Sequence, residues 1–289
     1  MSIVVWVDGS FVEPRERALS ALDHGVTVGD GIFETCAVYG GQAFALTRHL
    51  RRLARSAAGM GLPAPDEARI RDGVAQVLAA AGESAGRLRI TVTGGFGPMG
   101  SGREDGEETI VIAAGPAAPG PTSRAVRSPW VRNERSAVAG LKTTSYAENV
   151  VALADAVARG GDEAILANTV GELCEGTGAN VLVEVGGELL TPPLSSGCLA
   201  GITRELLLEW AAEDGLPVVE AALPFSVLDR VVVSGPDGGA SSGVGLALAG
   251  SVRNIQPVVS LDGVDVAVGP LSLAARELFD RRRRERMDP

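Results

Sequence analysis

The sequence predicts an α+β protein built from two domains. Strand-like runs of β-branched residues alternate with longer segments whose apolar residues recur at helical spacing. A chain of 289 residues with 45% hydrophobic content is also long enough to form two cores. Proline and glycine concentrate at 116–123, as in an interdomain linker. We therefore expect a small N-terminal domain at 1–115 and a larger C-terminal domain at 124–289.

The expected N-terminal domain begins with a β-hairpin, because strand-like residues flank the tight-turn pair Asp8-Gly9. Thr47 is expected to begin a helix, since its hydroxyl suits an N-cap and the residues after it have helical spacing. Another helix is predicted at 67–81. Further strands are predicted at 32–39, 43–46, 88–93 and 108–114.

The expected C-terminal domain alternates strands with helices. Strands are predicted at 125–130, 163–167, 180–185, 189–191, 230–233 and 246–249, and helices at 146–159, at 203–213 and from about residue 271. The glycine-rich segment at 235–245 is interpreted as a loop. The basic run Arg281–Arg284 is interpreted as a solvated helix end.

Charge and composition argue against several classes of protein. The formal net charge of −10 disfavours a nucleic-acid-binding surface, which needs clustered positive charge. No apolar run approaches the roughly 18 residues of a membrane span, and no basic segment opens the chain, so we expect a cytoplasmic protein without membrane contact. The 3 cysteines and 2 histidines lack the spacing of a metal site or a disulfide framework.

Lysine is the most informative residue type in the sequence, because Lys142 is the single lysine among 26 basic residues. Codon bias towards arginine explains most of this skew, but it does not explain the lysine that remains. A lysine amine is the side chain that forms a Schiff base with an aldehyde cofactor. Lys142 precedes a predicted helix, and from its position alone a structural and a catalytic interpretation both stay open.

Two further features suit a phosphorylated pyridine cofactor. Glu175 lies in a glycine-rich turn, and a carboxylate opposite a pyridine nitrogen keeps that nitrogen protonated. An ordinary turn acid is the alternative. Gly201-Ile202-Thr203 opens a predicted helix whose first N–H groups, with the Thr203 hydroxyl, form a ready anion site. Ser251 offers one more hydroxyl.

Several short motifs stand in an order and spacing that match a known family. They are Asp23-His24-Gly25, Gly29 to Thr35, His49 to Leu53, Lys142, Glu175 to Asn180, Gly201 to Arg204 and Gln256-Pro257-Val258. Together they resemble the class IV aminotransferases, which include branched-chain and D-amino-acid aminotransferases, R-selective amine transaminases and aminodeoxychorismate lyases. The resemblance spans nearly the whole chain. It implies two α+β domains with pyridoxal 5′-phosphate (PLP) between them, in a homodimer whose partner helps close the active site.

The resemblance also implies roles for single residues. Lys142 would be the Schiff-base lysine and proton shuttle, and Glu175 would face the pyridine nitrogen. Arg52 would bind the PLP phosphate, as would the helix start at Ile202 and Thr203.

Two departures from the family pattern stand out. The asparagine that often follows the lysine by three residues is Ser145 here. The segment between Val233 and Ser251 is longer and richer in glycine than usual, so Ser251 is the least secure of the implied phosphate ligands.

Within the family, the sequence favours an aminodeoxychorismate lyase, which acts in folate biosynthesis by eliminating pyruvate to leave 4-aminobenzoate. D-amino-acid aminotransferases carry a carboxylate-binding arginine where this chain has Val92-Thr93-Gly94-Gly95. The alternative is an aminotransferase acting on branched-chain or other amino acids or on small amines, and a non-catalytic binding protein is a third possibility. Arg103 is a further candidate for binding a substrate carboxylate.

Overall fold

A computed structural model describes residues 3–104, 106–231 and 244–289. The chain forms two compact units. The first comprises Met1–Ala118, Leu141–Tyr146 and Arg286–Pro289, and the second comprises Pro119–Gly140 and Ala147–Glu285. Two segments distant in sequence, one of them carrying Lys142, therefore join the N-terminal part of the chain. The predicted loop at 235–245 lies, except for its last two residues, outside the described residues and stays a prediction.

A six-stranded sheet forms the centre of the first unit, in the order β2-β1-β6-β5-β3-β4. Its strands are β1 (Val4–Val7), β2 (Ser10–Val12), β3 (Gly31–Tyr39), β4 (Gln42–Ala43), β5 (Arg87–Thr93) and β6 (Thr109–Gly115). The predicted hairpin is confirmed, and both turn residues have positive φ, 49° at Asp8 and 109° at Gly9. The strand expected at 43–46 is wrong beyond Ala43, because the helix already begins at Leu46.

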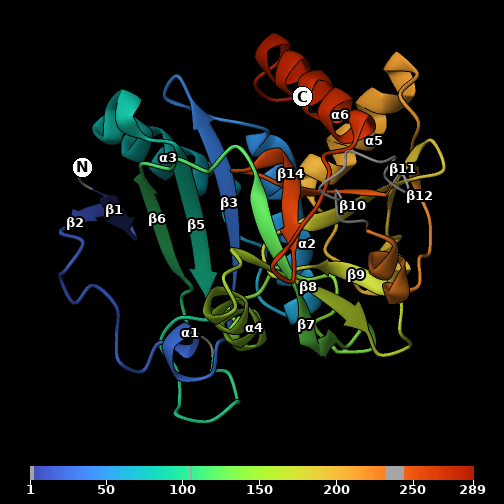
Figure 1. Ribbon diagram of the computed structural model, residues 1–289. Coiled ribbons are helices and arrows are strands. Elements are labelled where there is room, and N and C mark those ends of the chain that lie inside the picture. The colour runs from blue at the N-terminus through green and yellow to red at the C-terminus, as the bar shows by residue number, and fades with distance from the viewer. Residues whose placement is uncertain (1–2, 105, 232–243) are drawn as a thin grey trace. The chain divides into compact units, whose positions relative to one another are not determined.

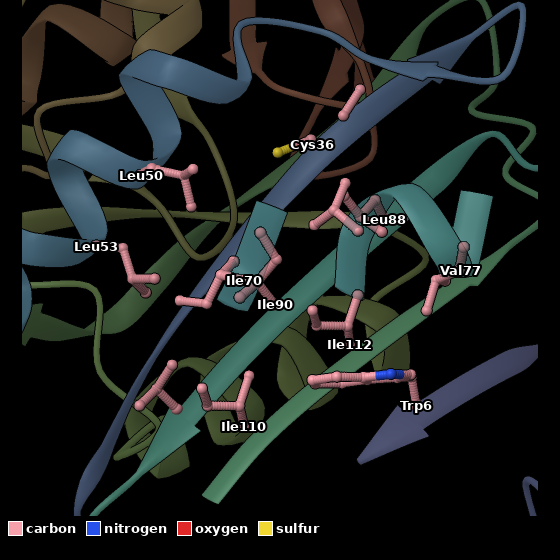
Figure 2. Close-up of a cluster of buried hydrophobic side chains, with 14 of the residues drawn as sticks. Trp6, Cys36, Leu50, Leu53, Ile70, Val77, Leu88, Ile90, Ile110 and Ile112 are labelled. Atoms are coloured by element: carbon pink, nitrogen blue, oxygen red, sulfur yellow. The ribbon is translucent and has the colours of Figure 1, made fainter. Parts of the chain in front are cut away.

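Three helices accompany this sheet: α1 (His24–Thr27), α2 (Leu46–Met60) and α3 (Glu67–Ala81). The side chains of α2 and α3 pack with those of the sheet in one buried cluster, part of which Figure 2 shows around Trp6, Ile90 and Ile112. The helix at 67–81 is confirmed. Thr47 is not the N-cap of α2, because Ala45 occupies that position with φ 54° and ψ 34°.

The second unit contains a nine-stranded sheet in the order β12-β11-β10-β13-β14-β7-β8-β9, with β15 paired to β14. Figure 1 labels most of these strands. The strands are β7 (Ser123–Arg132), β8 (Glu163–Asn168), β9 (Leu173–Gly176), β10 (Asn180–Val185), β11 (Glu188–Thr191), β12 (Val218–Glu220), β13 (Gly245–Gly250), β14 (Asn254–Leu261) and β15 (Val264–Asp265). The helices are α4 (Ala147–Ala158), α5 (Ile202–Asp214) and α6 (Pro270–Glu285). The predicted helices of this unit are confirmed to within a few residues.

The strands of the second unit differ from the prediction in several places. The turn expected around Glu175 is the strand β9, whose residues Leu173 and Cys174 are fully buried against β8. The strand β14 escaped prediction because Pro257 lies within it, and proline cannot donate to a ladder. The strand expected at 230–233 is wrong at its first two residues, because Arg230 ends a 3₁₀ helix at Phe225–Arg230 and Val231 is not in a strand. Residues 232–233 lie outside the described residues, so that part stays a prediction.

The helices of the described residues bear on two predictions, one about membranes and one about the basic run at 281–284. None of the helices at 3–104, 106–231 and 244–289 combines the length and apolar character that would let it cross a membrane. The basic run at the end of α6 is paired with acids, since Arg282 contacts Glu213 and Asp214 of α5. The run does lie at the end of a helix, but only Arg281 and Arg284 are exposed, whereas Arg282 and Arg283 are half-buried in ion pairs.

Ile90→Ala should destabilise the first unit by about 2–5 kcal/mol, because the fully buried side chain leaves a cavity between the sheet and its helices. Urea unfolding measures this change. The matched control is Ile3→Ala, the same truncation at a side chain that is 52% exposed, which should change stability by less than about 0.5 kcal/mol. Equal losses in the two variants would contradict the placement of this core.

Candidate active site

Lys142 is held by backbone hydrogen bonds within the first unit. The Phe33 N–H donates to the Lys142 carbonyl at 3.0 Å, and the Thr144 N–H donates to the Gly31 carbonyl at 2.8 Å. The Lys142 N–H donates to the Ser56 hydroxyl of α2 at 3.1 Å. The segment around the lysine therefore pairs with β3 and is also bound to α2.

Glycine at the start of β3 makes this pairing possible. A Cβ at Gly31 would lie 2.9 Å from both the Val92 carbonyl oxygen and the Thr144 hydroxyl, closer than side chains tolerate. The preceding Gly29 has φ +69°, and its carbonyl accepts hydrogen bonds from the hydroxyls of Thr144 at 2.8 Å and Ser145 at 2.9 Å. Ser145, which replaces the common asparagine, thus ties the lysine segment to the loop before β3.

The amine of Lys142 lies on an aromatic surface. Its Nζ is 4.4 Å from the ring centroid of Phe33 and 5.8 Å from that of Tyr146. The two rings contact each other edge to face, with centroids 5.2 Å apart. A ring face attracts a cation and shields it partly from water. Lys142 is half-buried as a residue, and its Nζ lies against these two rings.

Arg89 is a candidate residue that the sequence interpretation missed. Its guanidinium carbon is 3.8 Å from the centroid of the same Phe33 ring, so one ring contacts both Arg89 and Lys142. Desolvation by the sheet lowers the pKa of Arg89, although the side chain remains accessible to solvent. The pairing register of β3 and β5 explains the contact. Arg89 lies opposite Thr35, and Thr35 shares a face of the sheet with Phe33, two residues before it. Because this register is not visible in the sequence, Arg89 was not predicted.

Glu34 of β3 is the centre of a buried charge network. It accepts hydrogen bonds from Nε and Nη2 of Arg52 at 2.8 and 2.7 Å, and its Oε2 is 2.6 Å from Nδ1 of His49. Burial raises the pKa of Glu34, but the charges and hydrogen bonds of Arg52 and then His49 outweigh it and lower this pKa to about 2. Burial also lowers the pKa of His49. The Glu34 carboxylate thus orients Arg52, the predicted phosphate ligand. Glu34 lies in the motif Gly29 to Thr35, but no role was predicted for it from the sequence.

Arg103, the predicted substrate ligand, is tied to groups within the first unit. Its Nε and Nη2 donate to the Asp30 carboxylate at 2.7 and 2.6 Å, and Nη2 and Nη1 donate to the carbonyls of Met60 and Gly61 at 2.8 and 2.9 Å. The hydrogen bond from Arg103 is the largest cause of a lowered Asp30 pKa. These contacts fix a surface loop, and substrate binding by Arg103 stays a prediction.

Glu175 occupies a buried position in the second unit. Its Oε2 accepts a hydrogen bond from the Leu199 N–H at 2.9 Å, and its Oε1 is 3.3 Å from Nε of Arg132. Arg132 is itself held by Asn149, whose Oδ1 accepts from Nη2 at 2.8 Å. Glu175 is only 9% exposed, and these contacts hold its carboxylate in place.

The predicted phosphate ligands of the second unit lie at a helix start and in a strand connection. Gly201 is the N-cap of α5 and provides no side-chain hydrogen bond, while Ile202 and Thr203 are buried in the first turn. A Cβ at Gly201 would lie 1.9 Å from Oδ1 of Asn180, so this approach requires glycine. Ser251 is half-buried in the turn between β13 and β14.

The chemical groups in the two units fit PLP. The first unit offers the amine of Lys142 on an aromatic surface. The second offers the buried carboxylate of Glu175, which suits a pyridinium, and a helix start without a side-chain cap at Gly201, which suits a phosphate.

Comparison with known proteins identifies the class. The family model described as amino-transferase class IV matches residues 31–261. A putative branched-chain-amino-acid aminotransferase of Methanocaldococcus jannaschii is 31% identical over 95% of this chain and 94% of its own. A bifunctional aminodeoxychorismate lyase/D-amino acid transaminase of Mycobacterium tuberculosis is 30% identical over 96% and 98%. The solved structure of a hypothetical aminotransferase from M. tuberculosis, in its PLP-bound form, has a TM-score of 0.81 at 28% identity and covers 96% of this chain and 97% of that one.

The chain therefore belongs to the class IV aminotransferase family. Enzymes of this family use PLP, so the predicted fold class, enzyme class and cofactor are confirmed. The family includes aminotransferases and lyases, and membership does not by itself select between them.

The charge of Glu34 should make stability depend on pH in a defined window. Its folded pKa of about 2 lies below the usual 4.5, so its contribution is present above pH 4.5 and is lost as the pH falls toward 2. At neutral pH, Glu34→Gln should cost about 3–5 kcal/mol, because Arg52 stays buried without its partner. Urea unfolding from neutral to acidic pH should show the wild-type and variant curves converging.

The control for this measurement is Glu67→Gln, the same change in an exposed pair with Arg71. It should alter stability by less than about 1 kcal/mol. Parallel curves for wild type and Glu34→Gln across the acidic range would contradict the assigned pKa.

Proposed function

We propose that this chain is a PLP-dependent aminotransferase of amino acids, or of other amines that carry a carboxylate. The observation that carries the proposal is the pair of cations on one ring: the Lys142 amine and the Arg89 guanidinium both lie over Phe33. A substrate whose amino group reaches Lys142 would find a carboxylate-binding group nearby. A neutral amine would make no use of Arg89.

PLP, when bound, supplies an electron sink that stabilises negative charge at the carbon next to the substrate nitrogen. Lys142 would hold the cofactor through Nζ and, once released, move a proton with the same atom. Glu175 would keep the pyridine nitrogen protonated. The phosphate ligands that the family resemblance implies are Arg52, Ile202, Thr203 and Ser251.

The contacts around Lys142, Glu175 and Arg52 support these proposed roles. Backbone hydrogen bonds at Phe33 and Thr144 position Lys142 without using its amine. The Leu199 N–H and Arg132 position the carboxylate of Glu175, the group that suits a pyridinium. Glu34 orients the Arg52 guanidinium, so little ordering is needed when an anion binds.

A lyase that releases pyruvate from aminodeoxychorismate is the second candidate. It would use the same lysine and the same cofactor contacts, and its substrate also carries carboxylates. The M. tuberculosis relative bears both a lyase and a transaminase name, while the M. jannaschii relative is named an aminotransferase. Transamination is therefore the activity that these names share, and we place it first.

The proposal includes a homodimer, as the family resemblance implies. Sedimentation equilibrium tests this part, and a monomer at micromolar concentration would refute it.

A half-reaction distinguishes the two enzyme functions. When the PLP-loaded protein receives alanine or glutamate without an acceptor, its near-visible absorbance should fall as the pyridoxamine form accumulates. Lys142→Ala should lack both the absorbance change and the activity, because the chain has no other lysine. Pyruvate release from aminodeoxychorismate, with no change of cofactor form on adding any amino donor, would refute transamination and support the lyase.

Arg89→Leu should lower kcat/KM for an amino acid by about 10–100-fold, the effect of losing a charged hydrogen bond worth about 1.5–3 kcal/mol. The value for a neutral amine should change little. Arg87→Leu is the matched control, since Arg87 is an exposed arginine of the same strand. Equal effects on both substrates, or an equal loss with Arg87→Leu, would remove Arg89 from substrate binding.

A further inference from the structure

No side chain close in sequence caps the N-terminus of α2. Its N-cap is Ala45, which makes no side-chain hydrogen bond, and the first turn contains no acidic residue. The helix carries four arginines and no acid in LTRHLRRLARSAAGM. Both features are unfavourable, because the first N–H groups need acceptors and the positive end of the helix dipole disfavours nearby cations.

The acceptor comes from a segment 241 residues away in the sequence. Oδ1 of Asp288 accepts a hydrogen bond from the Thr47 N–H at 2.9 Å, and Oδ2 accepts one from the Thr47 hydroxyl at 2.5 Å. Asp288 thus performs the function of an N-cap aspartate, although it does not precede the helix. It also places a negative charge at the positive end of α2.

The residues on either side of Asp288 bind the same helix start. The Met287 carbonyl accepts from the Ala45 N–H at 2.8 Å, and the Pro289 main-chain oxygen accepts from Nε of Arg48 at 3.1 Å. We call Met287–Pro289 the tail strap. Three consecutive residues therefore hold the first turn of α2.

The face of α2 beyond this turn carries the buried side chains that matter for the candidate site. His49 and Arg52 bind Glu34, and Ser56 accepts the Lys142 N–H. Fraying of an uncapped first turn would loosen His49 first and would let the guanidinium of Arg52 shift with the helix.

We propose that Asp288 is a positioning residue for the cofactor phosphate: by capping α2 from the tail strap, it holds Arg52 where a phosphate is bound. This inference rests on the proposed role of Arg52 in phosphate binding. Asp288 acts through the helix and does not itself contact the cofactor.

The test compares binding of PLP and of pyridoxal, which lacks the phosphate, to the apoprotein. Asp288→Ala should raise the PLP dissociation constant about fivefold, which corresponds to the ~1 kcal/mol of a lost N-cap. Binding of pyridoxal should stay within about twofold, because it makes no use of Arg52. Asp288→Asn should restore most of the PLP binding, since asparagine caps helices as well as aspartate and only the charge is lost.

Hydrogen exchange at residues 46–50 supplies a second readout that does not depend on the cofactor. It should quicken in Asp288→Ala and not in Asp288→Asn. The matched control is Asp280→Ala, which removes an aspartate paired with Arg283 inside α6 and should leave both binding constants and this exchange unchanged.

The outcomes separate this inference from the proposed function. If Arg52→Ala weakens PLP binding but Asp288→Ala does not, the role of Asp288 is overturned and that of Arg52 stands. If Asp288→Ala weakens PLP and pyridoxal equally, or if Asp288→Asn fails to rescue, positioning through a cap is overturned. If Arg52→Ala leaves PLP binding unchanged, both roles are overturned.

Discussion

The pairing of Leu141–Tyr146 with β3 is the constraint on which the rest of the candidate site depends. Hydrogen bonds at Phe33 and Thr144 set the register of this segment, and that register determines that the Lys142 amine lies over the Phe33 ring. The lysine is therefore ordered by its backbone before any ligand is present. Such preorganisation reduces the entropy that binding and reaction would otherwise lose.

A buried charge extends this order from β3 to α2. Removing Glu34 from water is favourable only because Arg52 and His49 surround it, so the strand and the helix are held in one relative position. The same helix binds the lysine segment through Ser56 and is capped by Asp288. An arginine-rich helix that contains no acid thus depends on carboxylates from β3 and from the tail strap.

Elements that depend on contacts between residues close in sequence were predicted better than elements that depend on distant pairing. The helix at Glu67–Ala81 was predicted correctly, because its apolar spacing and its Asp66 N-cap are local features. Local signals misled at β9, where a glycine-rich segment reads as a turn, and at β14, where Pro257 argues against a strand. In both cases pairing with neighbouring strands outweighed the local preference.

The sequence by itself determined the two-unit α+β class, the single lysine and the order of motifs that indicated a PLP enzyme, because these depend on composition and spacing. Only the tertiary structure decided which charges meet. Strand register brings Arg89 to the Phe33 ring that Lys142 also contacts. Packing of α2 on β3 brings Arg52 to Glu34, and Asp288 caps α2 through Thr47, 241 residues earlier in the chain. Such contacts leave no local pattern, since they arise only when distant segments fold together.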